Sequence, residues 1–353
     1  MQNEFRYAIG LMSGTSLDGL DLVYVKFNNF DYKDFQIIHA ETKAYNTNLK
    51  SILSNAIRLN KKKLQEVNDD YGVYLGKCVN EFIEKFNIET VDFIASHGHT
   101  VFHQPDKGIT LQIGNGEKIA EETNIQVVYD FRTQDVNLGG QGAPLVPIGD
   151  KLLFNEYDFC VNLGGFANVS FENDKERIAF DICPVNIVLN FYVRKLGFDY
   201  DNNGKIASKG KINSDLLNKL NALDFYKKIP PKSLGLEWVQ EKVFPLIDDL
   251  EKDIPTILKT FVKHSAIQIS KVIKSSNRVL ITGGGVYNTF LIQEIENITQ
   301  TKIHLASKNL IEYKEALIFA FLGLLKLNGE VNCLKSVTGA SEDHSSGVVF
   351  PIN

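Results

Sequence analysis

The sequence predicts an α/β protein that is divided into two domains of similar build. The chain has 353 residues, which is more than one hydrophobic core usually fills. Hydrophobic residues make up 44% of it and charged residues 23%, as in ordinary globular proteins. One order of predicted elements, three strands followed by alternating strands and helices, occurs once in each half. The length and this repetition together predict two related domains.

The first half begins with three runs that are rich in aromatic and β-branched residues. They predict strands at Tyr7–Ser13, Leu22–Phe27 and Phe35–Thr42. Because the turns between them are short, we expect consecutive strands to pair antiparallel. The remaining predicted elements are helices at Leu49–Leu59, Lys62–Phe86 and Glu117–Thr123, and strands at Val91–Ala95, Ile109–Ile113 and Ile125–Tyr129. This order favours a mixed sheet with helices on its faces.

The second half repeats the pattern. Its three short strands are predicted at Phe159–Leu163, Ala167–Phe171 and Ile178–Asp181, and a helix begins at Pro184, since proline suits the first helical turn. The remaining predicted elements are helices at Ser214–Leu223, Ile254–Ser275, Asn288–Ile295 and Glu312–Leu327, and strands at Arg278–Thr282 and Lys302–Leu305. This duplicated order is the build of actin-like ATPases and sugar kinases. We therefore expect two actin-like (ribonuclease H-like) domains with an interdomain cleft, the first spanning residues 1–132 and completed by the tail 341–353, the second spanning residues 133–340.

Charge and cysteine content exclude several function classes. A net charge of −5 argues against a nucleic-acid-binding protein, because no basic face can form. The four cysteines lie far apart and form no CxxC pair, which fits a reducing compartment. The N-terminus lacks the pattern of a signal peptide, and no apolar run approaches the roughly 20 residues that cross a bilayer. We expect a cytoplasmic protein without membrane association.

Two glycine-containing turns occupy matching places, each after the first strand of its half. A phosphate needs backbone N–H groups at close range, and glycine lacks the Cβ that would block its approach. Hydroxyl groups in the first turn add donors. The turns consist of Ser13, Gly14, Thr15, Ser16, Leu17, Asp18 and Gly19, and of Gly164 and Gly165. Each alone is better explained as a hairpin turn, whereas the pair favours a phosphate clamp.

A third glycine run, Gly283-Gly284-Gly285, follows a predicted strand and precedes a helix. Its backbone offers a flat platform for a purine base at a helix N-terminus. The alternative is an ordinary helix-entry turn, although three consecutive glycines are more than such a turn requires.

Motifs along the whole chain resemble those of the anhydro-N-acetylmuramic acid kinase family. The first is Gly10–Asp21, which includes Leu20, and the others follow in the family's order. They are Ser96-His97-Gly98-His99, Gln112–Gly116, Asp130-Phe131-Arg132 with Asp135, Gly139–Pro147, Asn162–Asn168, Pro230–Ser233, Gly283–Gly285, Glu315-Ala316 and Val337–Ala340. The resemblance implies an actin-like fold, ATP and Mg²⁺ as cofactors, an anhydro amino sugar as substrate, and a homodimer. It also implies a reaction in which water opens 1,6-anhydro-N-acetylmuramic acid and ATP phosphorylates O6, as part of peptidoglycan recycling.

The family's catalytic base stands in an Asp-Thr-Gly-Pro-Gly-Asn motif, which matches Asp181–Asn186 here. The resemblance makes Asp181 the catalytic base. The other reading is an acid that offsets the dipole of the following helix. Ile182, Cys183 and Val185 differ from the family pattern, so we expect added side chains near the reacting groups. Cys183 is either a reactive thiol or a small apolar filler.

The remaining candidates concern the substrate and the metal. A guanidinium pairs bidentately with a carboxylate, so Arg132 is expected to bind the lactyl carboxylate of the sugar, the alternative being a surface salt bridge. His97 is a candidate substrate contact, and His99 stands where the family usually has glutamine. Glu315 either binds the sugar or favours a helix N-terminus. Asp18, and also Asp21, could hold Mg²⁺ or be turn and strand acids.

Two other functions stay open because of the altered motif. One is a kinase that acts on a different amino sugar, and the other is a nucleotide- or muropeptide-binding sensor with weakened turnover. Retention of Asp181 favours the enzymes, whereas Ile182 and Val185 keep the alternatives open.

Overall fold

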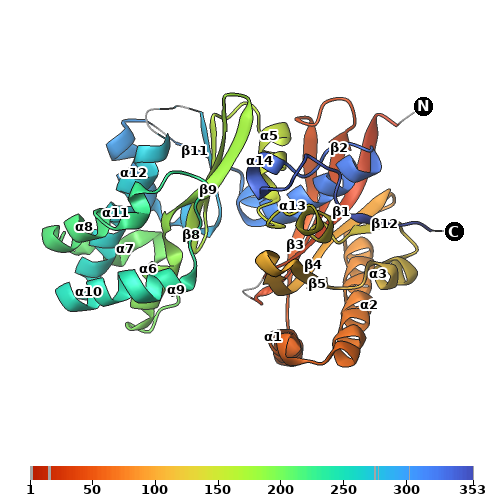
Figure 1. Ribbon diagram of the computed structural model, residues 1–353, viewed down its shortest axis with the longest axis horizontal. Helices are drawn as coiled ribbons and strands as arrows, with labels where there is room; N and C mark the ends of the chain where they lie inside the picture. The colour runs from red at the N-terminus through yellow and green to blue at the C-terminus, as the bar shows by residue number, and fades with distance from the viewer. Residues whose placement is uncertain (1–2, 15–16, 274–275, 277, 302, 353) are drawn as a thin grey trace. The chain divides into compact units, whose positions relative to one another are not determined.

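The computed structural model describes residues 3–14, 17–273, 276, 278–301 and 303–352 (Figure 1). The chain forms two compact units, residues 1–154 with 313–353, and residues 155–312. These units differ from the predicted division: residues 133–154 and 313–340 lie in the first unit. Thr15 and Ser16 of the first glycine turn, the predicted helix end at Ser275 and the predicted strand start at Lys302 lie outside the described residues.

The first unit is built on a mixed sheet with the strand order β12-β6-β4-β1-β2-β3, in which β5 also pairs with β4. Its strands are β1 (Phe5–Ser13), β2 (Gly19–Asn28), β3 (Phe35–Ala44), β4 (Phe93–Gln104), β5 (Ile109–Ile113), β6 (Val127–Tyr129) and β12 (Val348–Phe350). Its helices are α1 (Thr47–Asn55), α2 (Lys61–Phe86), α3 (Gly116–Thr123), α4 (Thr133–Asn137), α5 (Val146–Leu153), α14 (Lys335–Thr338) and most of α13 (Lys308–Leu327). The first three strands are antiparallel neighbours, and β4 runs parallel to β1 and to β6.

Helices cover both faces of this sheet because side chains of β1 alternate between them. Ile9 and Leu11 pack into the hydrophobic cluster that includes Leu75 and Phe82 of α2. On the opposite face α13 approaches so closely that a Cβ on Gly10 would lie 2.2 Å from the Ala316 carbonyl oxygen. Figure 1 shows α13 beside the strands of this unit and α2 standing next to α3. The first unit is therefore a layered α/β structure.

The second unit contains a five-stranded sheet in the order β11-β10-β7-β8-β9. Its strands are β7 (Phe159–Leu163), β8 (Phe166–Asn173), β9 (Glu176–Pro184), β10 (Val279–Thr282) and β11 (His304–Leu305). Its helices are α6 (Asn186–Arg194), α7 (Lys205–Lys209), α8 (Ser214–Asn221), α9 (Leu236–Trp238), α10 (Phe244–Leu250), α11 (Ile254–Ile273) and α12 (Thr289–Thr299), with a π-turn at Val239–Val243 between α9 and α10. Buried residues of α6, α8, α11 and α12 form its core with the strands.

These elements confirm the predicted α/β class and the duplicated element order, while several boundaries differ. Strand β9 continues to Pro184, so helix α6 begins at Asn186 and the predicted helix start at Pro184 is wrong. Helix α13 begins at Lys308, four residues before the predicted Glu312. Strand β12 was not predicted, because three residues carry too little periodicity to be recognised.

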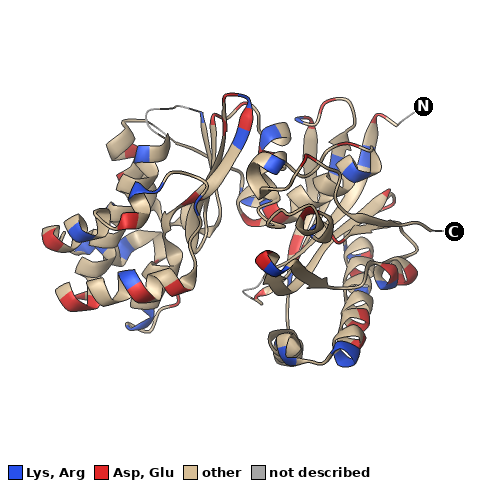
Figure 2. Ribbon diagram, viewed as in Figure 1, with Lys and Arg blue, Asp and Glu red and all other residues tan. Residues whose placement is uncertain are grey.

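Acidic and basic residues are interspersed along the helices of each unit (Figure 2). This mixture agrees with the net charge of −5. Among the helices of the described residues, none combines the length and the apolar character that a membrane span requires.

Candidate active site

In the first unit, the turn between β1 and β2 contains most of the predicted phosphate-binding residues. The Gly14 carbonyl accepts a hydrogen bond from the Leu17 N–H at 3.3 Å, and Leu17 has a φ of +58°, a backbone conformation that is rare for a side chain of its kind. Asp18 is exposed, whereas the Leu20 side chain lies in the hydrophobic core. Leu20 can therefore contribute only its backbone to a ligand.

Ser13, at the end of β1, directs its hydroxyl group into the first unit. The Tyr45 hydroxyl donates a hydrogen bond to Ser13 Oγ at 2.8 Å and lies 2.7 Å from the Tyr71 hydroxyl. Ser13 Oγ also lies 3.3 Å from Nδ1 of His99. Burial raises the pKa of Tyr45 and lowers that of His99, so both groups are neutral near pH 7. Because its hydroxyl has these internal partners, Ser13 holds the start of the turn in place.

Buried His97 and half-buried Arg132 form a hydrogen-bonded pair in the same unit. The His97 Nδ1–H group donates to the Gly98 carbonyl at 3.0 Å, and Arg132 Nε–H donates to His97 Nε2 at 3.1 Å. Burial, with a smaller contribution from Arg132, lowers the pKa of His97 well below its usual value, so the imidazole is neutral. Burial also lowers the pKa of Arg132 to about 10, which leaves the guanidinium charged at neutral pH. His97 therefore orients Arg132 through Nε and leaves its two terminal nitrogens for another acceptor.

Asp21 and Glu315 bring two acids near this arginine. The Thr42 hydroxyl donates to Asp21 Oδ1 at 2.6 Å. Glu315 keeps contact with solvent, so its desolvation is partial. This desolvation and the charge of Asp21 raise the pKa of Glu315, whereas the charge of Arg132 lowers it. Because α13 begins at Lys308, Glu315 is two turns inside the helix and the alternative of an N-terminal acid is wrong. The structure thus brings together His97, Arg132, Asp21 and Glu315.

In the second unit, the Gly164-Gly165 turn is attached to the start of α6. The Gly165 carbonyl accepts hydrogen bonds from the N–H groups of Val185 at 2.8 Å and Ile187 at 3.2 Å. The fold does not require glycine here: an added Cβ would come no closer than 3.4 Å at Gly164 and 3.8 Å at Gly165, and neither residue has a positive φ. Packing therefore leaves the backbone of this turn open to close approach by a ligand.

The Gly283–Gly285 run contains two glycines that the fold requires and one that it does not. Gly283 has a φ of +84°, and a Cβ on Gly285 would lie 2.7 Å from the Leu163 Cβ. These two glycines are therefore required by the fold. At Gly284 an added Cβ would meet no atom of the described residues within 4 Å, so a side chain there would extend into open space. Only Gly284 presents an uncovered backbone surface of the kind that a flat base could contact.

Asp181 lies half-buried in β9, next to an irregularity of the ladder. Ala167 pairs with Cys183 and Asn168 with Asp181, so Ile182 is the extra residue of a β-bulge. The Leu234 N–H group donates to Asp181 Oδ2 at 2.8 Å. Burial raises the pKa of Asp181, and the bond from Leu234 acts in the opposite direction. The carboxylate is therefore held at one oxygen and is more basic than an ordinary aspartate.

The three residues that differ from the family pattern are buried. Ile182, Cys183 and Val185 are at most 2% exposed and belong to the hydrophobic core of the second unit. Cys183 lies close enough to Asp181 for the two groups to interact electrostatically, so the expectation of added side chains near the reacting groups stays a prediction. Burial raises the pKa of the Cys183 thiol, so Cys183 is the apolar filler and not a reactive thiol.

The strand order of each unit defines the class of protein. In the first unit it reads β3-β2-β1-β4-β6 and in the second β9-β8-β7-β10-β11, with antiparallel pairing of the first three strands and parallel pairing of the others. This duplicated arrangement is that of the actin-like class, to which sugar kinases belong.

Comparison with known proteins identifies the family within that class. The family model for anhydro-N-acetylmuramic acid kinase matches residues 6–352. Proteins of that name from Haemophilus influenzae and Shewanella putrefaciens are 32% and 34% identical to this chain, each over 98% of both sequences. Among solved structures, the chain is similar to (R)-2-hydroxyglutaryl-CoA dehydratase component A of Acidaminococcus fermentans. The match covers 89% of this chain and 96% of that protein, with 12% identity and a TM-score of 0.46. The actin-like class follows from the strand order of the two units and not from this match.

The chain belongs to the anhydro-N-acetylmuramic acid kinase family. It is therefore a phosphotransferase that acts on a sugar.

Proposed function

We propose that this protein uses ATP to open 1,6-anhydro-N-acetylmuramic acid and to phosphorylate it at O6, giving N-acetylmuramic acid 6-phosphate and ADP. Water loses a proton to a base as its oxygen bonds to C1, and the bond between C1 and O6 breaks. O6 then takes the γ-phosphoryl group, and ADP leaves. The reaction would serve peptidoglycan recycling in the cytoplasm, where ATP is available.

The observation that carries this proposal is the environment of Asp181. A general base must be ionised at the working pH and basic enough to accept a proton from water. Partial burial raises its pKa, while the Leu234 N–H group orients one oxygen and leaves the other for water. We assign Asp181 as the catalytic base.

Arg132 is the proposed contact for the lactyl carboxylate that distinguishes muramic acid from other amino sugars. Its Nε–H group is engaged by His97, and the terminal nitrogens match the two oxygens of a carboxylate. The neutral imidazole of His97 acts as its orienting partner. Glu315, whose side chain reaches solvent near Arg132, is the proposed hydrogen-bonding partner for a sugar hydroxyl.

The glycine turns supply the proposed nucleotide contacts in each unit. In the first unit these are the backbone of Ser13–Asp21, and in the second the backbone of Gly164-Gly165 for phosphate and of Gly283–Gly285 for the base. Support comes from the glycines at 164, 165 and 284, which packing does not require.

Magnesium accompanies ATP in kinases and neutralises charge on the phosphates when bound. The residues present fit such an ion, because Asp18 and Asp21 offer carboxylate oxygens, the ligands that magnesium prefers. Exposed Asp18 and, close by, Asp21 would hold it directly or through water.

Burial in the core weakens the observation that favoured the two alternative functions. A different sugar, or loss of turnover, was inferred from Ile182 and Val185, and both side chains lie in the core.

The test is ADP release by purified protein with Mg-ATP and a panel of sugars. We expect turnover with 1,6-anhydro-N-acetylmuramic acid, and much less with the 1,6-anhydro sugar that lacks the lactyl group. Equal rates with both sugars would contradict the assignment of Arg132. Background rates with all of them, in protein that binds ATP, would overturn the proposed function.

A further inference from the structure

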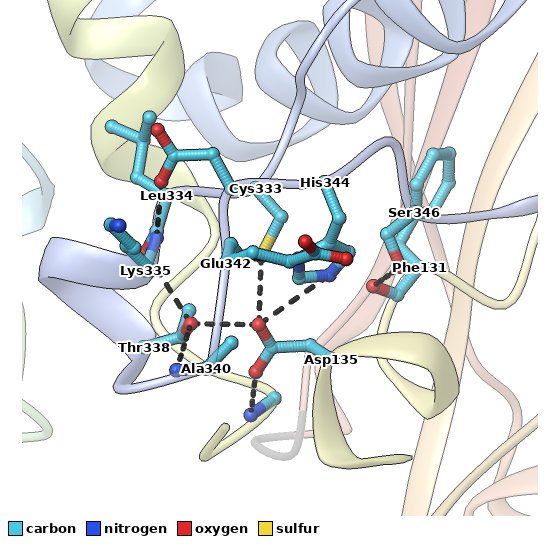
Figure 3. A network of polar contacts seen from close by, with 12 residues as sticks. Phe131, Asp135, Cys333, Leu334, Lys335, Thr338, Ala340, Glu342, His344 and Ser346 are labelled. Atoms are coloured by element: carbon cyan, nitrogen blue, oxygen red, sulfur yellow. Dashed lines mark hydrogen bonds and ion pairs between the residues drawn. The ribbon is translucent and has the colours of Figure 1, made fainter. Parts of the chain in front are cut away.

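Three metal-ligating side chains meet in the interior of the first unit, outside the site described above (Figure 3). They are Asp135 of α4, and Cys333 and His344 from the segment that follows α13. One ligand atom of each lies within 4.8 Å of the others, and all three residues are at most 6% exposed. The Cys333 Sγ atom lies 3.1 Å from Asp135 Oδ1, and His344 Nε2 lies 3.5 Å from the same oxygen.

The backbone fixes the relative positions of the two ligands that come from the C-terminal segment. Cys333 and His344 form an isolated antiparallel bridge in which each N–H group donates to the other residue's carbonyl at 3.1 Å. Residues that exchange both hydrogen bonds lie directly opposite, and their side chains project to the same side. The bridge therefore presents a thiol and an imidazole side by side to Asp135.

Hydrogen bonds from neighbouring residues also hold the Asp135 carboxylate in place. Its Oδ2 accepts a hydrogen bond from the Gly142 N–H group at 2.7 Å, and the Thr338 hydroxyl donates to Oδ1 at 2.7 Å. A Cβ on Gly140 would lie 2.2 Å from Oδ2, so the chain wraps closely around the carboxylate. Only Oδ1 faces the thiol and the imidazole.

The imidazole of His344 provides a second, independent indication of a ligand. The Glu342 carbonyl lies 3.1 Å from Nδ1 and can only accept, so Nδ1 carries the proton. Nε2 is the ring nitrogen that faces the cluster, and among the described residues this buried atom has no hydrogen-bond partner. It lies 3.5 Å from Asp135 Oδ1, which is within ion-pair range but is not a hydrogen bond. A histidine whose Nδ1–H group donates to a backbone carbonyl while Nε2 points at anionic groups is the arrangement that metal-binding histidines show.

We propose that Asp135, Cys333 and His344 bind a divalent transition-metal ion with the preferences of zinc. Thiolate, imidazole and carboxylate are the ligands that zinc takes in proteins, at roughly 2.0 to 2.3 Å. Ligand atoms around such an ion are about 3.3 to 3.8 Å apart, so the observed 3.1 and 3.5 Å need shifts of only a few tenths of an ångström. The Thr338 hydroxyl or a water completes the fourth position, and binding releases the Cys333 thiol proton.

Such an ion would be structural, since no proposed substrate or nucleotide contact takes part in it. It would join the segment around Cys333 and His344 to α4, in which Asp135 lies three residues beyond Arg132. Residues Ser341–Asp343, which directly precede His344, are exposed, so the chain next to the cluster reaches the surface.

The test is metal uptake by the full chain, after a chelator has removed bound metal and been exchanged away. We expect about one zinc ion per chain by elemental analysis. Cobalt loading should give a thiolate-to-cobalt charge-transfer band in the near ultraviolet and a higher melting temperature. Folded wild-type protein that takes up neither metal above a chelator-treated blank would overturn the proposal.

Variants localise the site. Cys333→Ser keeps a hydrogen-bond donor to Asp135 but should abolish the charge-transfer band, and His344→Gln should lower zinc content at least tenfold. Cys78→Ser, another buried cysteine, and His304→Gln, an exposed histidine, serve as controls and should bind as wild type. Unchanged zinc content in folded Cys333→Ser and His344→Gln would rule out this site.

Discussion

At Asp181 two opposing influences act on one carboxyl group. Burial raises its pKa and the Leu234 N–H group lowers it, and burial dominates. A base of this kind is useful in catalysis and unfavourable for folding, since the ionised form loses hydration in the folded state. We therefore expect Asp181 to affect both turnover and stability.

Replacing Asp181 by Asn removes the base and leaves the shape nearly unchanged. We expect kcat to fall by about 10²- to 10⁴-fold, the usual contribution of a general base, while ATP affinity stays within about twofold. Steady-state ADP release and nucleotide titration measure the two quantities. Asp174→Asn, an exposed acid in the turn between β8 and β9, is the control and should turn over as wild type. Loss of activity in both variants, or in neither, would speak against Asp181 as the base.

We expect ionisation of Asp181 to change stability and activity in opposite directions as the pH rises. The folded pKa of Asp181 is raised, so folding favours its protonated form. Its stabilising contribution is present below the unfolded pKa of about 3.9 and is lost as pH rises through the folded value. Activity needs the ionised form, so kcat/KM should rise over the same interval, with its acid limb above the ordinary range of aspartate. At pH 7 Asp181→Asn should accordingly unfold at a temperature equal to or above that of the wild type; a clear decrease would contradict the raised pKa.

Arg132 is expected to act through the geometry of its guanidinium. Arg132→Lys keeps the charge but loses the paired donors and the Nε–H bond to His97. We expect KM for the anhydro sugar to rise about 10- to 100-fold, as for loss of a charge-assisted hydrogen bond, with KM for ATP little changed. Arg278→Lys, at an exposed ion pair with Asp158, is the matched control. A KM for the sugar that is unchanged in Arg132→Lys would remove this residue from the substrate site.

At the scale of elements, substitutions in the glycine turns can distinguish glycines that packing requires from glycines that leave room for a ligand. Gly164→Ala and Gly284→Ala add a methyl group where the protein leaves room, so the melting temperature should not change. KM for ATP should rise, because the methyl group blocks close approach to the backbone. Gly285→Ala places a Cβ 2.7 Å from Leu163 and should destabilise the protein by about 1–3 kcal/mol. Unchanged KM for ATP in stable Gly164→Ala and Gly284→Ala would assign these turns to the fold alone.

Predictability from sequence also differs between elements. The three-strand meanders of both units could be predicted because alternating aromatic and β-branched residues with short turns leave few other pairings. The continuation of β9 through the bulge at Ile182 could not, since it depends on pairing with β8. Ile182, the extra residue of that bulge, and Cys183 both lie in the core, and their burial could not be predicted from the motif around Asp181.

Some site features arise only from long-range contacts. The hydroxyl of Ser13 suits phosphate binding by residue type, yet Tyr45 and His99 occupy it from elsewhere in the first unit. His97 was predicted to contact substrate, and its orienting bond to Arg132, 35 residues away, was invisible in the sequence. The cluster of Asp135, Cys333 and His344 spans about two hundred residues and has no spacing signature of a metal site.

For the whole molecule, the repeated strand order and the family match make the chain a sugar phosphotransferase, whereas ring opening is the central proposal. Opening by water and phosphoryl transfer leave a product that contains both the added water and the phosphoryl group. A measurement of ADP release alone does not show whether water was added to the sugar.

The most direct test is the mass and phosphorylation site of the product formed from 1,6-anhydro-N-acetylmuramic acid, measured by mass spectrometry and phosphorus NMR alongside ADP. We predict one N-acetylmuramic acid 6-phosphate per ADP, heavier than the substrate by one water and one phosphoryl group. A phosphorylated product that retains the anhydro ring, or ADP accompanied only by inorganic phosphate, would contradict this account.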